Sequence, residues 1–249
     1  MRFTAVGELL VDVVASGSGH AASIRVRAGG SAFNAAATAA ALGAESGVAG
    51  VVGDDPAGRL ILAELARLGI HADVPVLAGT TGTFVLVDGT IRVERGVSRE
   101  LCLPERIEAD AVLVSGYLEA DTIETALLRS RAPWVALDVA RLSELPAGGN
   151  AVFANEEAAR RLTGTAPDEA VRILANRYRL ACVTRGAKGA VAILDDRRES
   201  AGADPVDGGA PGAGDAFAAA LLVELAQGAD LADALAAGCR SGARAAARS

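Results

Sequence analysis

The sequence predicts an α/β protein: a three-layer αβα sandwich with a mostly parallel central sheet and a small second β-sheet. Three observations support this. Short apolar runs alternate with helix-forming segments along most of the chain, which predicts a parallel sheet with helices on both faces. Hydrophobic residues make up 51% of the chain but aromatic residues only 3%, so small side chains build the core. One Asp-Gly hairpin signal interrupts the alternation.

The first part of the chain contains clear signals for the ends of its elements. Gly43 and Gly69 stand where helices stop. Asp55 followed by Pro56 is a cap residue before a proline at the first helical position. The expected elements are a strand at 3–6, a helix at 31–42, a strand at 47–52 and a helix at 56–69.

The segment 84–94 has a different pattern. Two alternating runs flank Asp88-Gly89, which is a strong two-residue hairpin signal. Because a hairpin does not fit a series of strand–helix units, we expect a small sheet that stands off the main body, formed by about 13–27 and 75–97. The chain contains no internal repeat, low-complexity tract or interdomain linker, so residues 1–249 are expected to form one domain.

The second part of the chain returns to alternation. Gly164 and Gly228 stand after helical segments and mark their ends. The expected strands are 111–115, 134–139, 151–155, 181–184 and 190–194. The expected helices are 121–130, 156–162, 167–178 and two closing helices that Gly228 separates.

Composition excludes several classes of function. A formal charge of −7 argues against a nucleic-acid binder, which needs a dense basic surface. The three cysteines and two histidines lie too far apart for a zinc site, a disulfide framework or a histidine-based triad. Glu8 and Asp12 interrupt the apolar stretch that a signal peptide needs, and no run is long enough to span a membrane. We expect a cytoplasmic protein without a membrane partner.

The glycine-rich turn at 212–215 is the first candidate site. Glycines allow successive backbone N–H groups to converge on one point, and the helix that follows adds its partial positive charge, which together suit a phosphate. The alternative is that Asp215 is an ordinary cap residue. The turn is not a P-loop, because the GxxxxGK[ST] pattern is absent.

Other polar residues have local explanations when each is taken alone. Asn155 precedes a helix as a cap residue would, Asp12 resembles a turn residue, and Thr184 begins a segment typical of a hairpin. However, each of them, like the 212–215 turn, is expected to follow a strand. In an open parallel sheet the ligand crevice lies at the carboxyl ends of the strands, so these residues are expected to share one crevice.

Taken in order, these segments resemble the ribokinase-like carbohydrate kinases, the phosphofructokinase B (PfkB) family. The matching segments are GELLVD (7–12), GGSAFN (29–34), VVGDDPAG (51–58), NEEAARRLTG (155–164), TRGAKG (184–189) and GAGDAF (212–217). The resemblance covers nearly the whole chain, and it implies a β lid over a sugar site.

The resemblance also implies roles for individual residues. Asp215 would be the catalytic base that takes a proton from the substrate hydroxyl. The remaining roles are an anion hole from Gly212, Ala213 and Gly214, contacts to sugar hydroxyls from Asp12, Gly29, Gly30 and Asn34, and contacts to ATP phosphates from Asn155, Thr184 and Gly186.

The implied cofactors are ATP and Mg²⁺, and the sequence departs from the family near the expected metal site. The family usually has Asn-x-x-Glu, whereas Ala158 occupies the fourth position here, which leaves Glu157 as the candidate metal ligand. A one-residue shift turns a helical side chain by about 100°, so Glu157 does not occupy the position of the family's glutamate. We therefore expect Ala158→Glu to strengthen Mg²⁺ dependence or to raise the rate. The approach to the glycine turn, Gly209-Ala210-Pro211, also differs from the family's Asp-Thr-Thr-like segment.

The leading hypothesis is an ATP-dependent kinase that phosphorylates a hydroxymethyl group on a small sugar or sugar acid. One alternative is a nucleoside kinase on the same fold. Another is a non-catalytic protein that binds a sugar or nucleotide, which Ala158 would explain but the retained Asp215 argues against. The edges of a small lid sheet also favour a homodimer formed through the lid.

Overall fold

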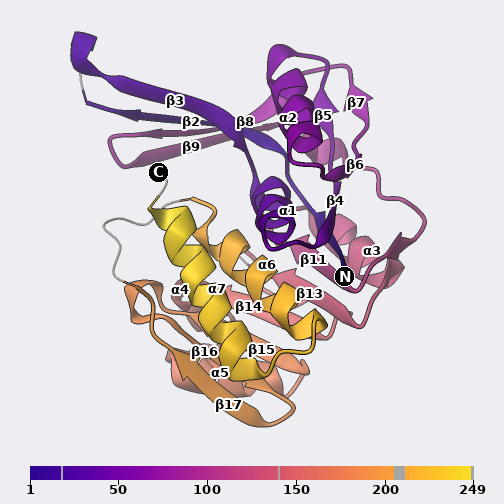
Figure 1. The fold of residues 1–249 in the computed structure, drawn as a ribbon, viewed down its shortest axis with the longest axis vertical. Coiled ribbons are helices and arrows are strands. Elements are labelled where there is room, and N and C mark those ends of the chain that lie inside the picture. The colour runs from indigo at the N-terminus through magenta and orange to yellow at the C-terminus, as the bar shows by residue number, and fades with distance from the viewer. Residues whose placement is uncertain (18, 140, 205–210, 248–249) are drawn as a thin grey trace.

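The computed structural model describes residues 1–249 except 18, 140, 205–210 and 248–249. Within these residues the main sheet has nine strands, in the order β17-β16-β15-β14-β13-β11-β1-β4-β6 (Figure 1). All neighbouring pairs are parallel except β15–β16 and β16–β17. The strands are β1 (Arg2–Val6), β4 (Glu45–Ala49), β6 (His71–Asp73), β11 (Ala111–Ser115), β13 (Trp134–Asp138), β14 (Ala151–Asn155), β15 (Leu180–Thr184), β16 (Ala190–Leu194) and β17 (Arg197–Ala201). The mostly parallel sheet is therefore confirmed.

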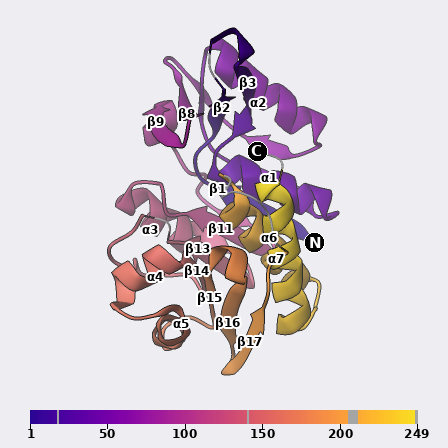
Figure 2. The ribbon, with the colours of Figure 1, turned by 90° about the vertical axis from the view of Figure 1, so that its left-hand side faces the viewer.

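Helices cover both faces of this sheet, as the edge-on view in Figure 2 shows. One face packs against α1 (Ser31–Ala41), α2 (Pro56–Arg67), α6 (Ala213–Ala226) and α7 (Leu231–Ala246). The other packs against α3 (Ala120–Arg129), α4 (Glu156–Thr163) and α5 (Pro167–Ala175). Among the described helices, none is both long and apolar enough to cross a bilayer.

The central strands bury side chains on both faces, which explains their continuous apolar runs. In β13, Trp134 and Ala136 belong to the core on the α6 side, whereas Val135 and Leu137 belong to the core on the α3 side. Small residues bring the helices close: a Cβ atom at Gly238 of α7 would lie 3.0 Å from the Phe217 ring of α6. The low aromatic content therefore fits tight helix packing.

The small sheet has the strand order β3-β2-β8-β9 within the described residues. The strands are β2 (Leu10–Ser16), β3 (Ser23–Gly29), β8 (Thr81–Val87) and β9 (Thr90–Gly96). The predicted hairpin is confirmed, because β8 and β9 are antiparallel and Asp88 and Gly89 between them have φ values of 46° and 78°. The sheet begins earlier than expected, since β2 starts at Leu10.

The predicted strand at 47–52 is divided into two strands. β4 ends at Ala49, and β5 (Val52–Gly53) pairs with β7 (Val76–Leu77) in a separate two-stranded sheet. Gly50 lies between them and passes close to Leu9, so that a Cβ atom there would be 2.6 Å from Leu9 Cδ1. Both edge strands of the main sheet, β6 and β17, were also absent from the prediction. The remaining short elements are β10 (Ile107–Glu108), β12 (Ser130–Arg131), η1 (Gly19–Ala21), η2 (Val97–Glu100) and η3 (Gly186–Lys188).

The predicted helix ends are largely confirmed. The Asp55 side chain accepts a hydrogen bond from the Gly58 N–H (2.8 Å), and Pro56 is the first residue of α2. Gly164 ends α4 in the left-handed conformation with φ 72°. These ends fix where each connection leaves the sheet.

Candidate active site

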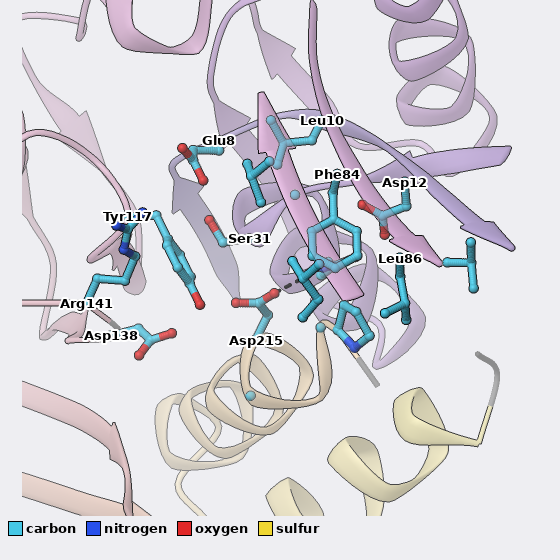
Figure 3. Close-up of a pocket in the computed structure, with 18 of the residues that line it drawn as sticks. Glu8, Leu10, Asp12, Ser31, Phe84, Leu86, Tyr117, Asp138, Arg141 and Asp215 are labelled. Atoms are coloured by element: carbon cyan, nitrogen blue, oxygen red, sulfur yellow. Dashed lines mark hydrogen bonds between the residues drawn. The ribbon is translucent and has the colours of Figure 1, made fainter. Parts of the chain in front are cut away.

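A cavity of about 940 Å³ lies between the inner face of the small sheet and the carboxyl ends of the main strands (Figure 3). The amino ends of α1 and α6 also open into it. Its polar lining includes Glu8, Asp12, Asn34, Tyr117, Asp138, Arg141, Asn155, Thr184 and Asp215. The crevice expected at the carboxyl ends of the strands is therefore present, and it brings together side chains from both sheets.

Asp215 lies partly buried in the first turn of α6. The amide Nδ2 of Asn34 donates a hydrogen bond to Asp215 Oδ2 at 3.0 Å (Figure 3). Gly212 makes this contact possible, because its φ is 91° and a Cβ atom there would lie 2.7 Å from Asn34 Nδ2. The glycine turn thus orients the carboxylate toward the cavity.

Burial, together with the nearby carboxylate of Asp138, raises the pKa of Asp215 to about 7, and the hydrogen bond from Asn34 opposes this shift. A carboxylate with a pKa near neutral pH can both accept and release a proton under physiological conditions. A carboxylate of this kind, placed in a cavity, is chemically able to act as a general base.

The start of α6 also offers unpaired backbone donors. No side chain caps this helix. The structure gives the N–H groups of Ala213, Gly214 and Asp215 no hydrogen-bond partner within the described part of the chain. Free N–H groups at the positive end of a helix form a site for an anion. The anion would lie next to the Asp215 carboxylate. The preceding Gly209 and Ala210 lie outside the described residues.

Asp12 reaches the cavity from the small sheet. The sequence analysis expected a residue just after the first strand, whereas Asp12 lies within β2 opposite Phe84 of β8. It is only 3% exposed, and its Oδ2 lies 3.5 Å from Arg27 Nε. Burial raises the pKa of Asp12, and Arg27 opposes this shift.

The two glycines of the GGSAFN segment have different roles. Gly29 makes room for Asp12, because a Cβ atom there would lie 2.4 Å from the Asp12 carboxylate, and Gly29 does not line the cavity. Gly30 lines the cavity and begins α1 with φ 91°, where a Cβ atom would lie 2.4 Å from the backbone oxygen of Glu8. Gly30 therefore lets α1 begin directly beside the backbone of Glu8, in the connection between β1 and β2.

Asn155 and Thr184 line the other end of the cavity. They are neighbours at the carboxyl ends of β14 and β15, where they pair in register. Asn155 also caps α4, since its side chain accepts a hydrogen bond from the Ala158 N–H at 2.7 Å. The cap interpretation and the cavity location are both correct. Gly186 lies in η3 and is not part of the cavity lining.

The position of Glu157 does not suit a metal ligand at this site. Its side chain is 89% exposed, outside the cavity lining, and its Oε1 lies 3.8 Å from Arg161 Nη1. Ala158 is fully buried in the core beneath α4. The one-residue shift along the helix thus turns Glu157 away and Ala158 inward. A glutamate at position 158 would enter the apolar core, so the burial of Ala158 argues against the expected gain in Mg²⁺ dependence from Ala158→Glu.

Sequence reasoning missed several charged residues of the cavity. Asp138 ends β13, so the rule that selected Asn155 could have found it. Glu8 was not recognised as part of the site, because its partner is distant in sequence: Arg95 Nε lies 3.3 Å from Glu8 Oε1, and Arg95 Nη1 lies 3.4 Å from Glu119 Oε1. Burial raises the pKa of Glu8, and Arg95 opposes this.

The contact between Asn34 and Asp215 leads to a first prediction. Asn34→Asp would place a second carboxylate beside Asp215, and like charges raise each other's pKa, so the pKa of Asp215 should rise by about 1 unit or more. Carboxyl ¹³C shifts followed over a pH titration measure this directly. Thr38→Ala, one turn further along α1, is the control and should leave the titration unchanged. An unaltered Asp215 titration in Asn34→Asp would mean that the two side chains do not interact in solution.

Comparisons with known proteins identify one family by its sequence profile, and solved structures with the same fold. A sequence profile described as "pfkB family carbohydrate kinase" matches residues 2–249. A ribokinase from Thermotoga maritima is 20% identical with a TM-score of 0.82, covering 99% of this chain and 93% of its own. An adenosine kinase from Sinorhizobium meliloti is 23% identical with a TM-score of 0.78, covering 97% and 92%. An Arabidopsis thaliana ribokinase complexed with ribose and ATP is 22% identical with a TM-score of 0.77, covering 94% and 88%.

Proposed function

This chain belongs to the pfkB family of carbohydrate kinases, and we propose that it transfers the terminal phosphoryl group of ATP to a hydroxymethyl group of a small sugar or sugar acid. The observation that supports this most directly is that the Asp215 carboxylate lies beside the N–H groups at the start of α6, which have no hydrogen-bond partner within the described residues. A proton acceptor and an anion site lie side by side in one cavity, as phosphoryl transfer to an alcohol requires.

The acceptor would bind between the small sheet and α1. Asp12, Gly30 and Asn34 line this part of the cavity and provide acceptors and donors for sugar hydroxyls. Gly29 would contribute indirectly, by leaving space for the Asp12 carboxylate. Because Asn34 also contacts Asp215, a bound hydroxymethyl group would lie within reach of the base.

The donor would bind at the opposite end of the cavity. Asn155 and Thr184 would contact the phosphates of ATP, and the amides of 212–215 would hold the phosphoryl group that is transferred. Gly186 would contribute only through the shape of the η3 turn, since it does not line the cavity. The solved ribokinase complexed with ribose and ATP is a relative that accommodates both ligand types.

The chemical step assigned to the protein is proton removal. Asp215 would take the proton of the acceptor hydroxyl while the oxygen forms its bond to the γ-phosphorus and the bond to the β-phosphate oxygen breaks. The amides of α6 would stabilise the charge on the phosphoryl oxygens.

Mg²⁺ would neutralise phosphate charge when it binds with ATP. No group of three or more His, Cys, Asp or Glu side chains positioned to hold a metal occurs among the described residues. The residues present therefore fit a metal that is held mainly by phosphate oxygens and water.

The four-stranded small sheet would act as the lid of the acceptor site. Its inner face contributes Leu10, Phe84, Leu86 and Val93 to the cavity. These side chains would exclude water from the reacting groups. A homodimer through this sheet would also cover exposed apolar residues outside the cavity lining, such as Ile24 of β3, which is 65% exposed.

The pH dependence provides a prediction. Because Asp215 must be ionised to accept a proton, kcat/KM should be low below the pKa of about 7, rise through it and level off above it. Initial rates between about pH 5 and 9 measure this. Asp138→Asn removes a charge that raises the pKa of Asp215, so its profile should move to lower pH. If the midpoint stays the same in Asp138→Asn, the profile does not report Asp215.

ADP release with Mg²⁺·ATP over a panel of neutral sugars, sugar acids and nucleosides tests the function as a whole. The apolar inner face of the small sheet favours a nucleoside as the second candidate, because the Phe84 ring and the neighbouring aliphatic side chains suit a base. ADP release with nucleosides but with no sugar or sugar acid would establish the nucleoside kinase. Tight ATP binding without release for any acceptor would instead indicate a non-catalytic binding protein.

A further inference from the structure

Two polar side chains end neighbouring strands of the main sheet on the same face. Ser115 ends β11 and Asp138 ends β13, and the two residues pair in parallel register. In each strand the residue two positions earlier, Leu113 or Ala136, belongs to the core on the α6 side. Because side chains alternate along a strand, Ser115 and Asp138 also point toward α1 and α6.

A small cavity of about 10 Å³ lies between these strand ends and the amino ends of α1 and α6. Its polar lining comes from Ser31, Ser115, Asp138 and Asp215, and its apolar lining from Ala5, Val6, Ala32, Ala35 and Leu113. In Figure 3, Ser31 and Asp138 lie on the opposite side of the Asp215 carboxylate from the dashed hydrogen bond to Asn34. One water molecule needs roughly 10 to 15 Å³, and the cavities of proteins that stay dry are apolar. This polar cavity therefore suits a single water molecule.

The hydroxyl group of Ser115 has one hydrogen to offer to this cavity. Its Oγ accepts hydrogen bonds from Ser31 Oγ at 2.7 Å and from the Tyr117 N–H at 3.2 Å, which occupy both lone pairs. Its own O–H has no acceptor within the described part of the chain. Gly7 leaves room for the two serines, because a Cβ atom there would lie 2.7 Å from Ser115 Cβ and 3.0 Å from Ser31 Oγ.

The two carboxylates of the cavity can accept further hydrogen bonds. Asp215 Oδ2 accepts the hydrogen bond from Asn34, whereas its Oδ1 accepts none from any residue that the structure describes. An ionised carboxylate has about four acceptor sites, so Asp138 can accept a hydrogen bond from water in addition to its other contacts. A water molecule has two hydrogens, one for each carboxylate, and a lone pair for the hydrogen of Ser115.

We propose that this cavity binds one water molecule, which accepts a hydrogen bond from Ser115 and donates one to Asp215 and one to Asp138. The four polar side chains of the lining are then joined in one hydrogen-bonded network. The water holds Asp215 on the side opposite Asn34, so both oxygens of the carboxylate are bound by donors. Hydrogen bonds to a carboxylate favour its ionised form, so Ser115 acts as a positioning residue through the water. The water site does not depend on the proposed function, whereas its consequence for a catalytic base does.

Ser115→Ala tests the site, because it removes the hydroxyl group that orients the water. The loss of this donor should raise the pKa of Asp215 by about 0.5 to 1 unit. Carboxyl ¹³C shifts followed over a pH titration measure the change without any need for activity. The titratable groups that face Asp215 all remain in this variant; they are Asp138, Asp12, Glu8 and Tyr117. The expected rise therefore reports the lost hydrogen bond.

Ser46→Ala is the matched control. Ser46 of β4 is 3% exposed and Ser115 is 5% exposed, and each forms a hydrogen bond with α1. The Ser46 hydroxyl donates to the backbone oxygen of Ala36 at 2.8 Å, and Ser46 does not line the small cavity. Both variants should lose similar stability, because each loses one buried hydrogen bond. Only Ser115→Ala should change the titration of Asp215.

A crystal structure of the wild type, at a resolution that shows other buried waters, tests the site directly. We expect one density peak within hydrogen-bond distance of Ser115 Oγ, Asp138 and Asp215. A cavity without such density would overturn the proposal, and so would the same Asp215 titration in Ser115→Ala and the wild type. In an active kinase, the pH profile of kcat/KM should move to higher pH together with the titration. If the density and the titration agree with expectation but ADP release is absent with every acceptor, the water site stands and the proposed function fails.

Discussion

Asp215→Asn is expected to lower kcat by about 100- to 10,000-fold and, above pH 7, to make the protein more stable. The loss follows because the amide that replaces the carboxylate cannot accept the proton of the acceptor. Steady-state ADP release at pH 8 measures it, since the wild-type Asp215 is mostly ionised there. The hydrogen bond from Asn34 can persist, because the amide oxygen of the new side chain still accepts it.

The gain in stability follows from the raised pKa of Asp215. A carboxyl group whose pKa is higher in the folded than in the unfolded state favours folding below its ordinary pKa of 3.8. This contribution is lost as the pH rises to about 7. Asparagine does not ionise, so the free energy of unfolding of the variant should exceed that of the wild type by a few kcal/mol at most above pH 7. Below pH 4 the two proteins should be nearly equal.

Thermal melting at pH 4 and pH 8 tests the stability prediction. Asp121 is an exposed aspartate in the first turn of α3, outside the cavity, and Asp121→Asn is the matched control. That control should be slightly destabilised, because a negative charge there favours the helix dipole. If Asp215→Asn keeps full activity, Asp215 is not the base. If Asp215→Asn is less stable than the wild type at pH 8, as the control is, then burial does not destabilise the ionised Asp215 carboxylate.

Much of this fold could be predicted from local signals. The cap at Asp55, the left-handed glycine at Gly164 and the hairpin at Asp88 depend on residues close in sequence, and the structure contains each of them. Asn155 and Thr184 stand at the ends of predicted strands. They could be predicted to lie close together, because parallel strands place their carboxyl ends at one edge of the sheet.

The rest of the site depends on contacts between distant segments. The Glu8–Arg95 ion pair joins the connection between β1 and β2 to β9 of the small sheet, two segments that are far apart in sequence. The location of Asp12 within β2 depends on where the small sheet begins, and a pattern of apolar residues does not define that boundary within a few positions. In contrast, the buried face of α4 could have been predicted, because Ala158, Ala159 and Leu162 lie on one side of the helix and leave Glu157 on the other.

The environment of Ala158 leads to the second large expected effect. Ala158→Glu should destabilise the protein by several kcal/mol and lower the Tm by about 10 °C or more. Ala158 is 0% exposed and belongs to an apolar cluster with Ala159, Val171 and Leu174. A glutamate there must either bury its charge or remain protonated, and its extra atoms overpack the core. Differential scanning calorimetry measures the change.

Glu157→Ala is the matched control for this substitution. Its side chain is 89% exposed and its ion pair with Arg161 is long, at 3.8 Å, so the expected change is within about 0.5 kcal/mol. Position 158 is the third residue of α4, where a glutamate can in principle return toward the backbone of Asn155. If Ala158→Glu were as stable as the wild type and more dependent on Mg²⁺, α4 would have to shift enough to present that carboxylate to the cavity, and the buried position assigned to Ala158 would be wrong.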